Sequence, residues 1–373
     1  MGPARKVLHV GLISGTSMDG IDAALVYFGE RSCEVLASQT CPYNDNLRQH
    51  LLTASRNPKQ CTVDDIGMLD RRVGEAFRDA AVELLDKSGI RSAQIAAIGS
   101  LGQTLRHQPR ATHPFTLQIG DPNVIAAGTG ITTVADFRRR DLAVGGEGAP
   151  LAPAFHYWLW GDSAEGRAVL NIGGFANLTV LAKKPDNVHG FDTGPGNSLM
   201  DAWCQRHLGQ PFDSDGAWAA SGTVCEPLLD QLLADPYFRQ PPPKSTGFEY
   251  FNTAWLDAHL AIAGAVSAAD VQATLCELTA RTIADAVSAH AGGTMEVMVC
   301  GGGAHNRTLL DRIAKHLPGV RLSSTEAAGV GPDWVEAVLC AWLAARCIDG
   351  LPGNLPSVTG ADKPAVLGCI YPS

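Results

Sequence analysis

The segment best suited to chemistry lies between two apolar stretches near the N-terminus. It reads Gly15-Thr16-Ser17-Met18-Asp19-Gly20-Ile21-Asp22, with apolar residues on both sides. Glycine permits positive φ angles that turn successive N–H groups inward, and hydroxyls add donors, so such a turn can wrap an anion. It is not a P-loop, because it has no Gly-Lys-Ser/Thr ending and no helix follows directly. An ordinary hairpin turn rich in Gly and Ser is the alternative.

Two further glycine-rich turns occur later in the chain. Gly173-Gly174 separates two apolar segments, the second of which carries Asn177, and Gly301-Gly302-Gly303 precedes a helix expected from about Asn306. Helix N-termini and glycine turns both attract phosphate groups, and the third turn would suit the adenosine end of a nucleotide. One such turn is weak support for nucleotide binding, whereas three in a repeated arrangement are much stronger.

Two carboxylates and an arginine cluster complete the candidate chemistry. Asp192 ends an apolar strand before the sharp turn 193–197, which would present its carboxylate, although an Asp here could simply cap the next helix. Glu336 lies in the first turn of the last long helix, where carboxylates commonly serve only the helix dipole. Arg138, Arg139 and Arg140 follow a predicted strand and could be a solvated charge run or a bidentate anion contact.

The elements that must position these residues form a repeated pattern. Strands are expected at 6–13, 20–28, 33–42, 94–99, 116–119 and 131–137, with a helix that begins after Thr62 and stops at Gly89 and a short one after Asp121-Pro122. The second half repeats this order, with strands at 167–172, 175–182, 188–192 and 295–300. Helices are expected near 197, over 269–290, from about 306 and over 332–347.

Two β-β-β-α-β-α-β units predict an α/β protein of two RNase H-like (actin-like ATPase) domains facing each other across a nucleotide cleft. We expect an N-terminal domain of residues 1–135 plus 350–373. The C-terminal domain would span 136–349, with an irregular insertion at 211–255 that is rich in Pro and aromatic residues. Closure of the two domains around the substrates would exclude bulk water.

Composition narrows the class of protein. The chain has 373 residues, 45% hydrophobic and 18% charged, and its net charge of −9 argues against a nucleic-acid partner. Its ten cysteines include no Cys-x-x-Cys pair, which favours a reducing cytoplasm over disulfides or a zinc site. No apolar run approaches the roughly 18 residues of a membrane span. We therefore expect a cytoplasmic protein with no membrane contact.

Six motifs in order resemble the anhydro-N-acetylmuramic acid kinase family, within the superfamily of sugar kinases, chaperone ATPases and actin. They are Gly11–Asp22, Ala135–Asp141, Gly148–Pro150, Asn171–Asn177, Phe191–Asn197 and Cys300–Asn306. The resemblance covers about residues 8–370. It implies that water opens a 1,6-anhydro sugar from recycled cell wall at C1 while ATP phosphorylates O6, giving N-acetylmuramic acid 6-phosphate and ADP. It also implies a bacterial, cytoplasmic, Mg²⁺-dependent enzyme that is commonly a homodimer.

The resemblance also implies residue roles. Asp192 would be the general base that deprotonates the attacking water, Glu336 a second carboxylate at the substrate, and Arg138 the contact to the lactyl carboxylate or to phosphoryl charge. Residues Gly15–Asp22 would face the β- and γ-phosphates, Gly173, Gly174 and Asn177 the opposite side, and Gly301–Gly303 with Asn306 the adenosine. Many relatives in the superfamily carry an Asp where this chain has Gly11, so the magnesium ligands stay open, with Asp19 and Asp22 as candidates. Asp22 could instead face the core.

The chain departs from the family pattern at three places: Leu101 replaces a usual His, Ala126-Ala127-Gly128 replaces a charged pair, and Glu147 replaces a usual Gln. These departures leave fine substrate specificity open. One alternative function is a sugar kinase acting on a related amino sugar or another hydroxyl acceptor, which entry of water oxygen into the product would distinguish. Another is a nucleotide-switched binding protein of the chaperone type, which stimulation of ATP turnover by unfolded peptide would favour.

Overall fold

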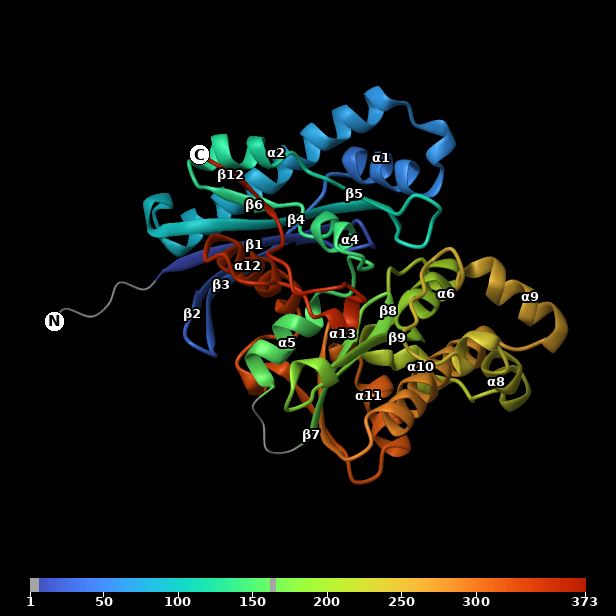
Figure 1. Ribbon diagram of the computed structural model, residues 1–373. Coiled ribbons are helices and arrows are strands. Elements are labelled where there is room, and N and C mark those ends of the chain that lie inside the picture. The colour runs from blue at the N-terminus through green and yellow to red at the C-terminus, as the bar shows by residue number, and fades with distance from the viewer. Residues whose placement is uncertain (1–6, 162–165) are drawn as a thin grey trace. The chain divides into compact units, whose positions relative to one another are not determined.

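The computed structural model describes residues 7–161 and 166–373, which fall into two compact units (Figure 1). Unit 1 combines Met1–Leu159 with Trp334–Ser373, and unit 2 is Trp160–Asp333. This division differs from the predicted boundaries after 135 and 349. The difference arises because the last long helix, α12 (Val335–Ile348), packs against strands of unit 1.

Unit 1 is built on a mixed sheet whose strand order is β12-β6-β4-β1-β2-β3, with β5 paired to β4. β1 pairs antiparallel with β2 and parallel with β4, which in turn pairs parallel with β6. The strands are β1 (Leu8–Ser14), β2 (Gly20–Phe28), β3 (Cys33–Pro42), β4 (Ile95–Gln108), β5 (Phe115–Ile119), β6 (Thr133–Ala135) and β12 (Cys369–Tyr371). All the strands predicted in this half are present, and apart from β4 they end within a few residues of the expected positions; β4 continues to Gln108, well beyond the predicted end at 99.

Helices cover both faces of this sheet (Figure 1). On one face α1 (Asp45–Arg56) and α2 (Val63–Ser88) pack on Val10, Leu12 and their neighbours. On the other face α12 lies so close to β1 and β4 that a Cβ at Gly11 or Gly99 would overlap backbone oxygens of the helix. Alternation along a strand sends adjacent side chains to opposite faces, so Gly11 serves helix packing where many relatives in the superfamily carry an Asp.

Unit 2 repeats the strand order of unit 1. Its sheet runs β11-β10-β7-β8-β9, with β7 antiparallel to β8 and parallel to β10, and β10 parallel to β11. The strands are β7 (Gly166–Ile172), β8 (Phe175–Val180), β9 (His189–Pro195), β10 (Thr294–Cys300) and β11 (Arg321–Ser324). In both units the first strand therefore lies between the second and the fourth, which confirms the predicted pair of RNase H-like domains.

The core of unit 2 forms around α10 (Ala268–His290), whose buried face includes Leu275, Leu278 and Ile283. The insertion 211–255 is irregular over 240–252, as predicted, but its earlier part contains short helices, of which those over 217–221 and 226–233 pack on α10. The remaining helices are α3 (Pro122–Thr129), α4 (Arg139–Ala143), α5 (Ala152–Trp160), α6 (Ser198–Leu208), α7 (Ala217–Ser221), α8 (Glu226–Leu233), α9 (Thr253–Ala263), α11 (Arg307–His316) and α13 (Pro356–Thr359).

Within the described residues, no single helix combines the length and the apolar composition of a membrane span. The bent pair α9 and α10 meets those criteria only when both helices are counted together across a bend of 117°.

Candidate active site

The turn between β1 and β2 is supported from behind by side chains of its own sheet. Ser14 Oγ donates to Gln103 Oε1 (2.7 Å), and Gln103 Nε2 donates to the carbonyl of Gly15 (3.1 Å). Met18 adopts a positive φ of 54°, and its N–H closes the turn on Gly15 O. Thr16 and Ser17 are exposed at the tip. Hydrogen bonds from its own sheet thus hold the turn in place, and the hydroxyls of Thr16 and Ser17 are exposed, as anion binding requires.

Six of the eight predicted residues of this segment divide into two groups. Thr16, Ser17 and Asp19 are exposed, and Ser17 Oγ donates to Asp19 Oδ1 (2.8 Å). Met18 and Ile21 are buried in the core of unit 1, and Gly20 is buried at the start of β2. The first group can touch a ligand directly, whereas the second can only position the turn.

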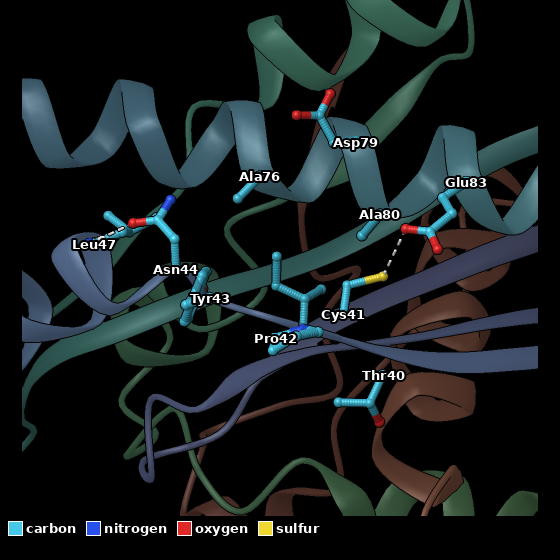
Figure 2. A pocket seen from close by; sticks show the side chains of 11 residues that line it. Thr40, Cys41, Pro42, Tyr43, Asn44, Leu47, Ala76, Asp79, Ala80 and Glu83 are labelled. Atoms are coloured by element: carbon cyan, nitrogen blue, oxygen red, sulfur yellow. Dashed lines mark hydrogen bonds between the residues drawn. The ribbon is translucent and has the colours of Figure 1, made fainter.

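Figure 2 shows a pocket between β2, β3 and the helices α1 and α2. Ile21 is one of the residues that line it. The pocket walls include Cys41, whose thiol donates to Glu83 (3.6 Å), and the rings of Pro42 and Tyr43. Of the predicted site residues, only Ile21 is among those that line it. This pocket therefore belongs to the packing behind the turn, not to the candidate site.

Asp22, Glu336 and Arg138 form a group of charges in unit 1. Asp22 is half-buried on β2, where it accepts a hydrogen bond from Thr40 Oγ1 (2.6 Å), so it does not face the core. Glu336, in the first turn of α12, is open to solvent yet closely surrounded by protein. Burial and then the charge of Asp22 raise the pKa of Glu336, and Arg138 opposes them. The three residues come from distant parts of the sequence, so the fold brings them together.

Arg138 is fixed by the loop that follows it. Its Nη1 donates to Gly148 O (2.8 Å), and Gly148 N–H donates to the buried carboxylate of Asp141 (2.7 Å). Asp141 also accepts from Asn354 Nδ2 (2.6 Å) and Thr359 Oγ1 (2.9 Å). Arg139 and Arg140, by contrast, are exposed. Arg139 makes an exposed ion pair with Asp136 (3.6 Å), whereas Arg138 is half-buried and hydrogen-bonded to the loop, which separates Arg138 from a solvated charge run.

The carbonyl groups of the Gly173-Gly174 turn in unit 2 accept backbone hydrogen bonds that fix the turn. Gly173 O accepts from Asn197 N–H (2.8 Å), and Gly174 O accepts from the N–H groups of Gly196 (2.9 Å) and Ser198 (3.0 Å). Asn197 Nδ2 donates further to Ile172 O (3.2 Å). The turn is thus packed against the start of α6, a contact that sequence reasoning did not predict.

A row of polar residues crosses the sheet of unit 2 beside this turn. Asn177 on β8 is the register partner of Asn171 on β7 and of Asp192 on β9. Residues directly opposite in antiparallel strands share one face. Asn177 therefore lies on the same face as Asp192, and Asn171 joins the candidate site.

Asp192 is held through its main chain and its side chain by the insertion. Its N–H donates to Lys244 O (3.0 Å), its C=O accepts from Tyr237 Oη (2.8 Å), and Thr246 N–H donates to Oδ2 (3.0 Å). Burial raises the pKa of Asp192 to about 6; Glu249 adds to this rise, while Thr246 N–H and Lys244 oppose it. The helix-cap alternative is wrong, because the N-cap of α6 (Ser198–Leu208) is Asn197 and no side chain caps this helix.

Such a carboxyl is suited to proton transfer, since a general base works best with a pKa near the operating pH.

The third glycine turn, Gly301–Gly303, follows β10 and turns with a φ of 79° at Gly301. The helix beyond it, α11, already has partners for its first N–H groups: Asn306 Oδ1 accepts from Leu309 (3.0 Å) and Asp215 Oδ1 from Arg307 (3.1 Å). Asn306 thus caps its own helix. The turn itself, rather than the end of α11, is the part available to a nucleotide.

The candidate residues thus form two sets. The set in unit 1 consists of the turn after β1, Arg138 and Glu336. The set in unit 2 consists of the two glycine turns and Asp192. Within the described residues, no group of three His, Cys, Asp or Glu side chains is placed to hold a metal ion.

Comparison with known proteins identifies the family. The model of the family described as anhydro-N-acetylmuramic acid kinase matches residues 7–373. A protein of that name from Xanthomonas campestris pv. campestris (strain 8004) is 54% identical over 369 residues, 98% of this chain and 97% of that protein. Another, from Coxiella burnetii (strain Dugway 5J108-111), is 51% identical over 367 residues, 98% of each chain.

Among solved structures, the chain is similar to component A of (R)-2-hydroxyglutaryl-CoA dehydratase from Acidaminococcus fermentans. The identity is 12% and the TM-score 0.47, over 91% of this chain and 99% of that one. The family assignment comes from the sequence relatives: this chain belongs to the anhydro-N-acetylmuramic acid kinase family.

Proposed function

We propose that this enzyme uses ATP and water to convert 1,6-anhydro-N-acetylmuramic acid into N-acetylmuramic acid 6-phosphate and ADP, a step in the recycling of peptidoglycan. The observation that carries the proposal is the environment of Asp192. One of its carboxylate oxygens is held by Thr246 N–H, and burial raises its pKa to about 6. The other oxygen is then suited to accept a proton from water.

The chemistry couples two displacements. Asp192 removes a proton from water as the water oxygen bonds to C1 of the sugar, and the C1–O6 bond breaks. O6 bonds to the γ-phosphorus of ATP, and ADP leaves as the bond from phosphorus to its bridging oxygen breaks. The leaving oxygen therefore needs no general acid, in contrast to ordinary glycoside hydrolysis, because it takes a phosphoryl group in place of a proton.

Unit 1 would supply the charge and phosphate contacts. The exposed hydroxyls of Thr16 and Ser17 stand above a braced turn, as donors to the β- and γ-phosphates would. We assign Glu336 to orienting the water or the sugar, and Arg138 to the lactyl carboxylate by charge-assisted hydrogen bonds. The fixed position of Arg138 supports this choice over Arg139 and Arg140.

In unit 2, we assign the turns Gly173-Gly174 and Gly301–Gly303, with Asn177, to contacts with the nucleotide, and Asn306 to holding the third turn by capping α11. Their rigid backbones support this assignment. The amide N–H groups of such turns are the donors that a phosphate or ribose requires.

Mg²⁺ is implied by the family and by ATP use. The carboxylates beside the phosphate turn, Asp19 and Asp22, have the oxygen donors that Mg²⁺ prefers. Two such side chains fit an ion that is bound mainly through phosphate oxygens and waters. When bound, Mg²⁺ would neutralise charge that develops on the transferred phosphoryl group.

The departures from the family pattern bear on the substrate. Glu147 forms a two-contact ion pair with Arg110 (2.7 and 3.3 Å), which a Gln could not do. Leu101 is buried on β4, and the stem of Arg78 covers Gly128 so closely that any side chain there would collide with it. A kinase for a related amino sugar stays the second candidate.

We also propose a cytoplasmic location, which the ten free cysteines support because disulfides are rare in reducing compartments. The homodimer implied by the family stays a prediction that light scattering would check.

The deciding experiment is an ATP-coupled assay with 1,6-anhydro-N-acetylmuramic acid in oxygen-18 water, read by mass spectrometry. We expect a 6-phosphorylated product with one heavy oxygen at C1. Turnover of ATP only with ordinary amino sugars, with no heavy oxygen in the product, would contradict the proposal and favour the second candidate.

A further inference from the structure

The insertion beside Asp192 is a rigid aromatic assembly, not a loose loop. Phe238 stacks on Phe251 with ring centroids 5.4 Å apart, and Phe251 meets Trp255 edge-on at 5.0 Å. The buried carboxylate of Asp235 accepts from Tyr237 N–H, Tyr250 Oη and Trp255 Nε1, each at 2.9 Å. A segment fixed in this way can hold a charge in a defined place.

The charge that it holds is Lys244, whose residue is only 8% exposed. Its ammonium donates to the carbonyls of Tyr237 (3.3 Å) and Phe238 (3.4 Å) and lies 4.7 Å from the centre of the Tyr237 ring. In the described structure these contacts are with carbonyl oxygens and a ring, not with a carboxylate at ion-pair distance. Burial of a lysine without a close counter-ion is costly, which points to a role beyond packing.

Lys244 is also joined directly to Asp192. The N–H of Asp192 donates to Lys244 O, and two residues further on Thr246 N–H donates to Asp192 Oδ2. The ammonium and the carboxylate interact electrostatically, each favouring the charged form of the other. The same short segment thus orients the carboxylate and supplies it with a positive charge.

We propose that Lys244 is a positioning residue for the base: the main chain of residues 244–246 aims the carboxylate of Asp192, and the buried ammonium favours its ionised form. This inference rests on the proposed role of Asp192.

Other titratable groups act on the same pair. Glu249 opposes ionisation of Asp192, and the Tyr237 hydroxyl donates to the Asp192 carbonyl. His290 on α10 interacts with Lys244 and with His189 of β9, and burial lowers the pKa of His290. Glu249 is exposed, so it offers a change of opposite sign with little risk to folding.

The test is the pH dependence of kcat/KM for the full chain with ATP and the anhydro sugar. Loss of a positive charge should make Asp192 harder to ionise. We therefore expect Lys244→Gln to move the acid limb from about 6 upward by about one pH unit. On that limb this shift corresponds to an activity about tenfold lower, with the plateau kept. Lys244→Arg should leave the limb in place, and Glu249→Gln should move it downward.

Gln retains a donor for the carbonyls of Tyr237 and Phe238, so a role in hydrogen bonding alone would leave the limb of Lys244→Gln unmoved and would overturn the proposal. An equal shift in the exposed control Lys315→Gln would overturn it as well. Thermal melts verify that each variant is folded. If a Lys244 variant is unstable, Glu249→Gln still tests whether a change of nearby charge moves the acid limb of Asp192 in the expected direction. Full activity of Asp192→Asn would refute the base itself, a failure distinct from an unmoved limb in Lys244→Gln.

Discussion

The two units share a strand order but treat their first turns in opposite ways. In unit 1 the turn after β1 is exposed at Thr16 and Ser17, and its support comes from side chains, Ser14 and Gln103. In unit 2 the turn after β7 is a pair of glycines whose carbonyls are bound by three backbone N–H groups from the start of α6. The turn of unit 1 presents exposed hydroxyl donors, whereas the carbonyls of the turn in unit 2 are already hydrogen-bonded to the backbone.

The third strands of the two units, β3 and β9, also differ in their surroundings. β3 of unit 1 leads into Asn44, whose side chain caps α1 in the usual way. β9 of unit 2 carries Asp192 and is covered by the insertion. We propose that the duplicated fold carries its acid–base chemistry in one copy, where the added segment holds the carboxylate of Asp192. The other copy keeps the accessible turn and charges that suit a polyanion.

The largest expected effect concerns the carboxylate that only unit 2 possesses. Asp192→Asn should lower kcat by roughly 10²- to 10⁴-fold, since the variant cannot accept the proton of water. ATP binding, measured by calorimetry, should be nearly unchanged. The variant should melt no lower than the wild type at pH 8: burial raises the folded-state pKa of Asp192, so its ionised form costs stability at pH values above about 6.

Asp201 on α6 is the matched control, because burial raises its pKa to about 7 as well. Asp201→Asn should keep kcat. If both variants lost activity equally, the effect would reflect the loss of any buried charge in unit 2 and the assignment of Asp192 would be wrong.

The next effect concerns the charges of unit 1. Arg138→Ala should raise KM for the sugar by roughly 10- to 150-fold, the range that corresponds to a hydrogen bond with a charged group of about 1.5–3 kcal/mol. Steady-state kinetics at saturating ATP would measure this change. Arg140→Ala removes an exposed neighbour and should change KM little. Equal effects of the two substitutions would mean that the cluster acts only as a diffuse positive charge.

The sequence was sufficient for the repeated strands, whereas the role of motif residues such as Asp192 stays a prediction. Periodicity and local caps are short-range signals, as at Thr62, where a capping box starts α2 as expected, and at Gly89, which ends α2 in a left-handed conformation. Helix α1 was not predicted, although Leu47, Leu51 and Ala54 recur at helical spacing after the cap at Asn44. That signal was present in the sequence.

The partners of Asp192 could not have been found in this way. Thr246 lies 54 positions further along the chain, and its contact uses a backbone N–H that every residue except proline possesses. Lys244 has no periodic pattern around it, only prolines and aromatic residues. The grouping of Asp22, Arg138 and Glu336 likewise depends on how α12 packs on β1, which the sequence signals only through two glycines, Gly11 and Gly99.

The smallest expected effect tests how tightly the first turn of each unit is packed. A Cβ at Gly196 would meet the carbonyl of Gly173 and the backbone of Phe175 and Ala176, none of which can rotate away. Gly196→Ala should therefore destabilise unit 2 by about 1–3 kcal/mol, as overpacking does. A Cβ at Gly15 would meet only the hydroxyl of Ser17 at 3.7 Å. Gly15→Ala should leave the melting temperature within about one degree, because a shift of this size corresponds to well under 1 kcal/mol. Calorimetric melts of both variants would decide the matter, and equal losses of stability would show that the first turn is as tightly packed as the second.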